Sequence, residues 1–139
     1  MKKILLGISL FTFTLNADVV MCSGYQSIKS IDNVLQSKQD ISNMNFRLNT
    51  TNERATVIMG NEVNNYNYSR KEQHPAGYYM DVYKDSKGSN EELKYTKSKY
   101  FKGKFSVVAI RSVYKSNKKN VELVGTFICK KKEYYKENK

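Results

Sequence analysis

Apolar and polar side chains alternate along most of this sequence, with the period of two that is typical of half-buried β-strands. The clearest example is VELVGTFIC, residues 121–129, in which every second residue from Val121 to Cys129 falls on one face. Residues 104–114 and 77–85 alternate in the same way. Shorter segments that also fit strands are 18–25, 45–49, 54–60 and 64–70. The pattern therefore predicts a chain built mainly of short strands.

Short polar segments separate these strands and supply turns, among them TTNE, HPAG, DSKGSN and KSNKKN. Such short connections are typical of antiparallel sheets. The expected fold class is all-β, a small antiparallel β-barrel or sandwich of about seven to eight strands. The expectation includes one short helix near residues 30–38, because Ile28, Ile31 and Leu35 share a helical face and Ser30 can cap it.

The first 17 residues have the three-part layout of a secretory signal peptide. Lys2 and Lys3 precede a mostly apolar segment, 4–15, and Ala17 precedes a polar residue. The apolar segment is shorter than the roughly 20 residues that span a bilayer; a membrane anchor and a buried core segment are the alternatives. We expect a signal peptide at 1–17, a single β domain at 18–130, and a basic, disordered tail at 131–139. The mature protein is then expected to be a periplasmic or secreted monomer without a transmembrane span.

The two cysteines, Cys22 and Cys129, lie near opposite ends of the expected domain. Paired cysteines persist in the oxidising compartments that exported proteins reach. We therefore predict one disulfide that ties the first strand to the last. The alternatives are lipid modification of Cys22, after a faintly lipoprotein-like VVM, and disulfides between chains.

The charge of the chain, formally +11, is concentrated in its second half. Residues 18–83 hold 6 basic and 7 acidic residues, whereas residues 84–139 hold 16 basic and 6 acidic ones. The densest part is LKYTKSKYFKGKF, 93–105, in which lysines alternate with aromatic residues; as a strand it would form a ladder with Lys97 and Lys99 on one side. The candidate ligand-binding residues are Lys94, Lys97, Lys99, Lys102, Lys104, Tyr95 and Tyr100.

Such a surface attracts polyanions and offers rings for stacking. For an exported protein this indicates an anionic envelope polymer or an acidic protein partner, and no nucleic acid. The alternative is compositional: lysine-rich surfaces also accompany AT-rich genomes, and lysines protect sheet edges from aggregation.

The sequence offers no pattern for catalysis. The one histidine, His74, precedes Pro75 in an expected turn, where it is interpreted as structural. No metal-ligand spacing, phosphate-binding loop or nucleophile motif is present. Tyr66 and Tyr68 are expected to fill the core or to pack across strands; a recognition surface on one face of the strand is the alternative. We expect a protein that is not an enzyme and needs no cofactor or metal; a small glycan-acting enzyme with scattered carboxylates is the alternative.

In length, leader and a cysteine near each end, the chain is similar to exported β-barrel inhibitors of c-type lysozyme. That resemblance would imply an inhibitor of a secreted hydrolase. The family's recognition loop is a serine-rich segment followed by Gly and Tyr, whereas EQHPAGYYMD offers only Gly77, Tyr78 and Tyr79. The leading hypothesis is a non-enzymatic binding module of the cell envelope with a basic face.

Overall fold

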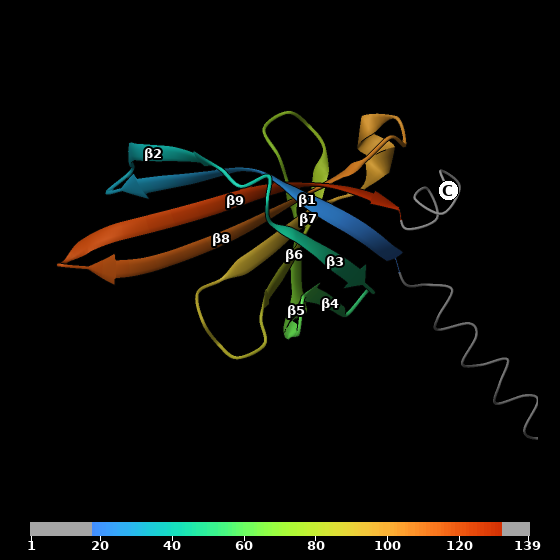
Figure 1. Ribbon diagram of the computed structural model, residues 1–139, viewed down its shortest axis with the longest axis horizontal. Helices are drawn as coiled ribbons and strands as arrows, with labels where there is room; N and C mark the ends of the chain where they lie inside the picture. Colours follow the sequence, from blue (N-terminus) through green and yellow to red (C-terminus); the bar gives the residue numbers. More distant parts are fainter. Residues whose placement is uncertain (1–17, 132–139) are drawn as a thin grey trace, which may run out of the picture.

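The computed structural model describes residues 18–131, and these form an antiparallel β-barrel (Figure 1). The elements are β1 (Asp18–Ile31), β2 (Val34–Asp40), β3 (Asn45–Thr50), β4 (Arg54–Met59), β5 (Glu62–Gln73), β6 (Tyr79–Asp85), β7 (Glu92–Thr96), the 3₁₀ helix η1 (Ser98–Phe101), β8 (Ser106–Ser116) and β9 (Lys119–Lys131). The predicted signal peptide at 1–17 and residues 132–139 of the predicted tail lie outside the described residues.

Eight strands close the barrel, and the ninth, β2, lies beside them. From β3 to β9 each strand pairs with the next along the chain, and β1 pairs with both β3 and β9. The all-β prediction is therefore confirmed, and the fold is the barrel rather than the sandwich. Closure pairs the first and last described strands, so both ends of the domain lie at the same seam.

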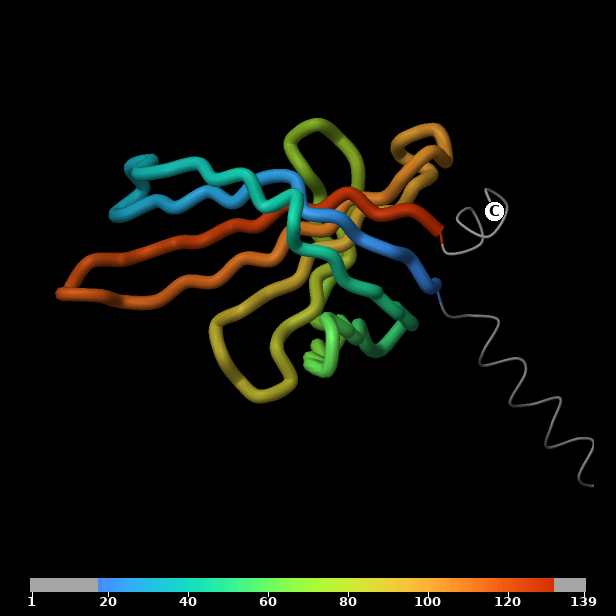
Figure 2. Tube along the Cα trace, viewed as in Figure 1, coloured from blue at the N-terminus to red at the C-terminus, as the bar shows by residue number. Residues whose placement is uncertain are grey.

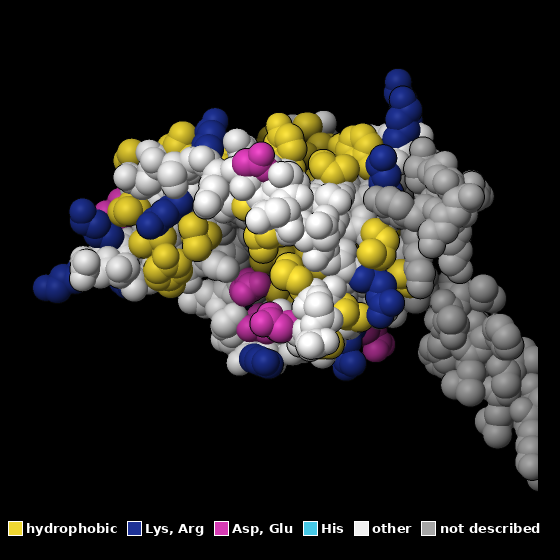
Figure 3. All heavy atoms as spheres, viewed as in Figure 1, with side chains coloured by type: hydrophobic (Ala, Val, Ile, Leu, Met, Phe, Trp, Pro, Cys, Tyr) yellow, Lys and Arg dark blue, Asp and Glu magenta, His cyan; other side chains and the backbone are white. Residues whose placement is uncertain are grey.

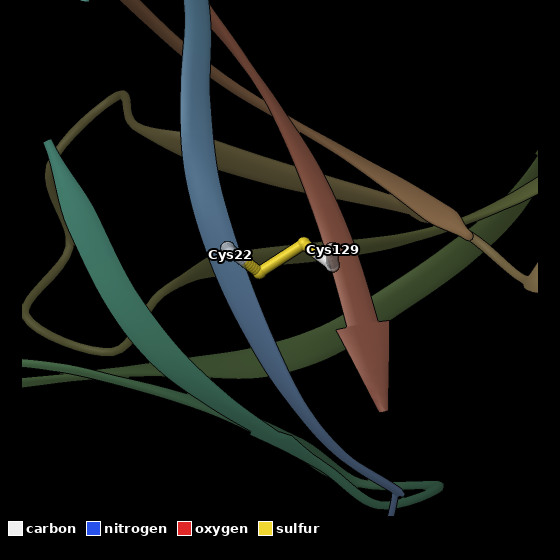
Figure 4. The surroundings of a disulfide bond; sticks show 2 residues. All are labelled: Cys22 and Cys129. Atoms are coloured by element: carbon white, nitrogen blue, oxygen red, sulfur yellow. A yellow bond between two sulfur atoms is a disulfide. The ribbon is translucent and has the colours of Figure 1, made fainter. Parts of the chain in front are cut away.

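The Cys22–Cys129 disulfide crosses this seam (Figure 4). The two residues face each other in the register of β1 and β9, and both are buried. Their Cα atoms are 4.0 Å apart, and the bridge links positions 107 residues apart in the chain. The predicted bridge between the terminal strands is confirmed, and it fixes the closure of the barrel covalently.

The barrel interior is filled by the inward-facing residues of the alternating pattern. Leu48, Leu93 and Val108 are fully buried there. Phe46 and Phe127 meet edge to face, with ring centroids 4.7 Å apart, in the geometry that aromatic pairs prefer. The interior is a packed hydrophobic core, as expected for an eight-stranded barrel.

The prediction of a helix near residues 30–38 is wrong. Ile31 ends β1 and Val34 begins β2, with Asp32 and Asn33 between them at φ 48° and 67°. Two successive residues with positive φ make a tight hairpin turn, and Asp and Asn adopt this conformation more readily than most residues. The apolar residues with helical spacing therefore fall on two paired strands.

Four strands extend beyond the barrel as an arm, made of β2 and of residues 26–31, 112–116 and 119–124 of β1, β8 and β9 (Figure 2). The chain enters β3 from the arm by passing close over Gly24: a Cβ there would lie 1.9 Å from the Ile41 carbonyl oxygen. Only glycine permits this approach. The arm tip carries Lys115, Lys118 and Lys119 around the β8–β9 turn. Because β8 runs the length of both parts, the arm tip and η1 lie at opposite ends of the molecule.

Candidate functional site

The lysine-rich segment 97–105 is a compact loop between β7 and β8 and does not form the strand ladder that the sequence predicted. Strand β7 ends at Thr96, and η1 follows directly. Lys102 and Gly103 then adopt φ 58° and 75°, and the amide of Gly103 donates to the carbonyl of Ser98 at 2.8 Å. These two left-handed residues end the 3₁₀ turn, as glycine commonly does at helix ends. We call residues 97–105 the basic loop.

Four lysines of this loop are exposed to solvent: Lys97, Lys99, Lys102 and Lys104. No acidic residue lies between positions 97 and 105. The exposed end of β9, Lys130 and Lys131, follows Cys129, which faces Ser106 at the start of β8. Figure 3 shows Lys and Arg side chains projecting from this end of the molecule. The loop therefore forms a locally positive surface.

Five aromatic rings from two separate segments meet at this end of the barrel. We call them the aromatic cluster: His74, Tyr78, Tyr100, Phe101 and Phe105. Tyr78 is central, because its ring centroid lies 4.4 Å from that of His74, 5.8 Å from Phe101 and 6.1 Å from Tyr100. Phe101 in turn stacks on Phe105 at 4.9 Å. The β5–β6 turn and the basic loop are thus joined through their rings.

His74 shapes the β5–β6 turn and also supplies a ring to the cluster. Its Nδ1 atom accepts a hydrogen bond from the amide of Ala76 at 3.0 Å, and its own amide donates to the carbonyl of Tyr78 at 2.8 Å. The imidazole stacks on the Tyr78 ring, with 11° between the planes. The structural role expected from the sequence is present, but the stacking contact could not be read from the turn itself.

Charge and aromatic surface are combined at Tyr100, which is 36% exposed. The Nζ atom of Lys99 lies 5.2 Å from the Tyr100 ring centroid, within the range of a cation–π interaction. Phe101 and Phe105, which stack on each other in the same loop, are half-buried. Rings held against one another in this way present a contact surface with little loss of side-chain entropy on binding.

Two of the predicted ligand-binding residues lie elsewhere. Tyr95 points into the barrel and is 4% exposed, and burial raises the pKa of its phenol. The Nζ atom of Lys94 lies 2.7 Å from a carboxylate oxygen of Glu72 on the outer face of the barrel. Both residues precede Thr96, so strand β7 directs Tyr95 to the core and Lys94 across β6 to Glu72 on β5. The basic loop alone carries the other five: Lys97, Lys99, Tyr100, Lys102 and Lys104.

The ion pairs around Lys94 balance its charge. Arg70 contacts both Glu72 and Glu92, at 3.4 and 3.1 Å. The hydrogen bond from Lys94 lowers the pKa of the Glu72 carboxyl. These side chains lie over Val82, which is fully buried and faces Arg70 and Lys94 in the sheet register. This outer cluster covers the sheet with equal numbers of opposite charges, and it adds no positive surface.

Neither a metal-binding cluster nor a helix able to cross a membrane is found in the part of the chain that the structure describes. Within residues 18–131, no group of three or more His, Cys, Asp or Glu side chains gathers as a metal site would require. Nor does any helix in that range have the length and apolar character needed to cross a bilayer.

No protein family, curated protein or solved structure matches this chain. The basic loop and the aromatic cluster are therefore interpreted from their own chemistry.

Proposed function

We propose that this protein is a non-enzymatic binding module of the cell envelope, which binds an anionic glycan at the end of the barrel formed by the basic loop and the aromatic cluster. The observation that carries the proposal is the contact of five rings from two segments beside four exposed lysines. The leader-like start of the chain and the disulfide support a periplasmic or secreted location, because disulfides persist in oxidising compartments.

The two kinds of side chain suit the two parts of such a ligand. Sugar rings present apolar C–H faces that pack against aromatic side chains, which are large, rigid and amphipathic. Carboxylate, phosphate or sulfate groups on the polymer pair with lysine ammonium groups. Lysine alone would bind any polyanion, so the rings favour a glycan over a simple acidic peptide.

The direct test is binding of the purified protein to polygalacturonate, with methyl-esterified polygalacturonate as the neutral probe of the same backbone. Binding should fall steeply as salt rises, because pairing with a polyanion releases its condensed counterions. We expect the neutral polymer to bind much more weakly than the charged one.

A pair of matched variants separates the site from net charge. Lys99, Lys102 and Lys104 are replaced by Gln in one variant, and Lys115, Lys118 and Lys119 in the other. Each variant loses three exposed lysines, and each includes one residue with positive φ, Lys102 or Lys118. The first should bind polygalacturonate more than tenfold more weakly, whereas the second, at the arm tip, should change affinity by less than about threefold, as expected for distant charges screened by salt.

Equal losses in both variants would contradict the proposal, because binding would then depend on total charge. A salt-insensitive, stoichiometric complex with a secreted hydrolase, in the absence of glycan binding, would instead support the inhibitor hypothesis.

A further inference from the structure

A second site lies at the mouth of the barrel, next to the basic loop, and apart from Lys97 it is lined by different side chains. It is a pocket of about 310 Å³ formed where β1 begins, β3 ends and β5 and β6 pass each other. Its charged lining residues are Asp18, Lys71, Asp81 and Lys97. Small-molecule sites have volumes of about 300–1,000 Å³, so this pocket suits a small ligand.

The two acidic residues of this pocket are less exposed to solvent than its two lysines. The Asp81 side chain is 15% exposed, whereas the Lys71 side chain is 59% exposed. Their closest N–O distance is 4.0 Å, and among the described residues Lys71 is the only ion-pair partner of Asp81. A carboxylate so largely removed from water normally has closer hydrogen-bond partners. Asp81 can therefore accept further donors from a ligand.

Asp18 and Asp81 converge on the same two tyrosines. Burial is the main cause that raises the pKa of Tyr83 and of Tyr95, and both carboxylates raise each of these further. The Tyr83 hydroxyl donates to the carbonyl of Thr51 at 3.0 Å, which fixes its ring in the pocket wall. Both carboxylates line the pocket together with Tyr83, although they start from different strands.

Aromatic faces complete the wall. Tyr68 and Tyr83 line the pocket and meet edge to face, with centroids 5.5 Å apart. Tyr68 remains 38% exposed. Tyrosine faces attract cations, most strongly where water is excluded. The inner part of the pocket therefore favours a positively charged group.

We infer that this pocket binds a small zwitterion, with its ammonium group directed to Asp81 and Asp18 and its anionic group held at the mouth by Lys71 and Lys97. The lining has two negative and two positive groups, so a simple cation or anion would meet a repelling pair as well as an attracting one. A ligand that carries both charges pairs with each. This inference goes beyond the glycan proposal, since it concerns another ligand and shares only Lys97 with the basic loop.

Phosphoethanolamine is the probe, because it joins an ammonium to a phosphate over a short linker. Calorimetric titration of the purified protein with phosphoethanolamine at concentrations up to about 10 mM should detect binding. Such high concentrations are needed because a ligand of so few atoms has a limited binding energy. Ethanolamine alone and inorganic phosphate alone should each bind at least tenfold more weakly. Equal binding of either fragment would overturn the inference, as would no binding of phosphoethanolamine.

Two variants assign the binding to the pocket. Asp81→Asn should weaken phosphoethanolamine binding about tenfold, whereas Glu62→Gln, an exposed carboxyl at the start of β5, should not change it. Lys71→Gln changes an exposed side chain, so it tests the site even if Asp81→Asn unfolds. It should weaken phosphoethanolamine binding severalfold. Unchanged binding in folded Asp81→Asn, or in Lys71→Gln, would overturn the site.

Two further experiments distinguish the possible sources of the ligand and test the two proposals separately. Co-sedimentation with vesicles containing phosphatidylethanolamine, but not with phosphatidylcholine vesicles, would identify a lipid headgroup, and binding of the free compound alone would identify a soluble zwitterion; both support the pocket. The variant lacking Lys99, Lys102 and Lys104 should still bind phosphoethanolamine, and Asp81→Asn should still bind polygalacturonate. Either proposal can then fail alone.

Discussion

Tyr78 connects the two segments of the proposed glycan site. It belongs to the short connection between β5 and β6, yet its ring contacts His74 in the same turn and Tyr100 and Phe101 across the barrel end. Sequence spacing could not reveal these contacts, because more than twenty residues separate Tyr78 from Tyr100. They arise from the pairing of β6 with β7, which brings the following loop beside the preceding turn.

At the same scale, Tyr100 tests whether the rings contribute to binding apart from charge. Tyr100→Ala should weaken polygalacturonate binding about three- to tenfold, because an aromatic contact contributes about 1 kcal/mol. The salt dependence should stay unchanged, since no charge is removed. Affinity across a salt series is the measurement. Tyr114→Ala is the matched control, because Tyr114 on the arm is 44% exposed and lies far from the loop. A similar loss in both variants would show that Tyr100 has no special role.

Single residues also show how far prediction from sequence reached. The alternation correctly placed Cys129 on the same inward face as Phe127, and hence the bridge. The alternation could not show that Tyr95 is buried and Tyr100 exposed. Both tyrosines lie among lysines, and the end of strand β7, which falls between them, is not marked in the pattern. The side chain before this boundary is buried, and the one after it is exposed.

At the scale of elements, the strands were more predictable from sequence than the loops and hairpin turns. The strands follow from a repeat of two, which each segment carries in itself. The basic loop required Lys102 to adopt positive φ, which is uncommon for lysine. The β1–β2 hairpin depends on Asp32 and Asn33, whereas its apolar residues happen to repeat with helical spacing. The Asp-Asn pair was the signal for a turn that the sequence prediction missed.

Substitution of Asn33 distinguishes this hairpin from a helix. Asn33 has φ 67°, a conformation that the short polar side chain of Asn tolerates and a β-branched side chain does not. Asn33→Val should therefore destabilise the hairpin by about 1–2 kcal/mol. Asn33→Gly should leave it unchanged or slightly more stable. Amide hydrogen exchange over residues 34–40 reports the local opening free energy. The opposite order, with glycine as the more disruptive residue, is what a helix would give.

At the scale of the whole molecule, the disulfide and the strand register stabilise the same closure. Ten β1–β9 residue pairs are formed beside the Cys22–Cys129 pair. The barrel should therefore keep its shape when the bridge is removed, while the unfolded chain gains freedom. This separates the effect of the bridge on stability from its effect on structure.

Replacement of Cys22 and Cys129 by Ser should lower the free energy of unfolding by about 4 to 5 kcal/mol, the chain-entropy estimate for a loop of about 100 residues. The far-ultraviolet circular dichroism should keep its β character below the denaturation midpoint. Urea unfolding of the wild type and the double variant measures the difference. Alkylation of two thiols in the native wild-type protein would contradict the bridge itself.

The buried tyrosines predict how the whole barrel responds to alkaline pH. Burial raises the pKa of Tyr66 and of Tyr83 far above the ordinary value of 10.0, and the hydrogen bond that Tyr66 donates to Glu91 raises the pKa of Tyr66 further. Because the folded pKa values exceed the unfolded ones, this stabilisation is complete below pH 10 and is lost as the pH rises above it. The free energy of unfolding should therefore fall between about pH 10 and pH 12.

Three variants isolate this effect from the lysines, which lose their charge in the same pH range. Tyr66→Phe and Tyr83→Phe should each flatten the fall in stability, because phenylalanine has no phenol to ionise when the chain unfolds. Tyr25→Phe should leave it unchanged, since the Tyr25 side chain is 63% exposed and folding does not bury it. Urea midpoints at several pH values, with tyrosinate absorbance recorded in parallel, provide the comparison. If all three variants lose stability as steeply as the wild type, titration of the lysines must cause the alkaline unfolding.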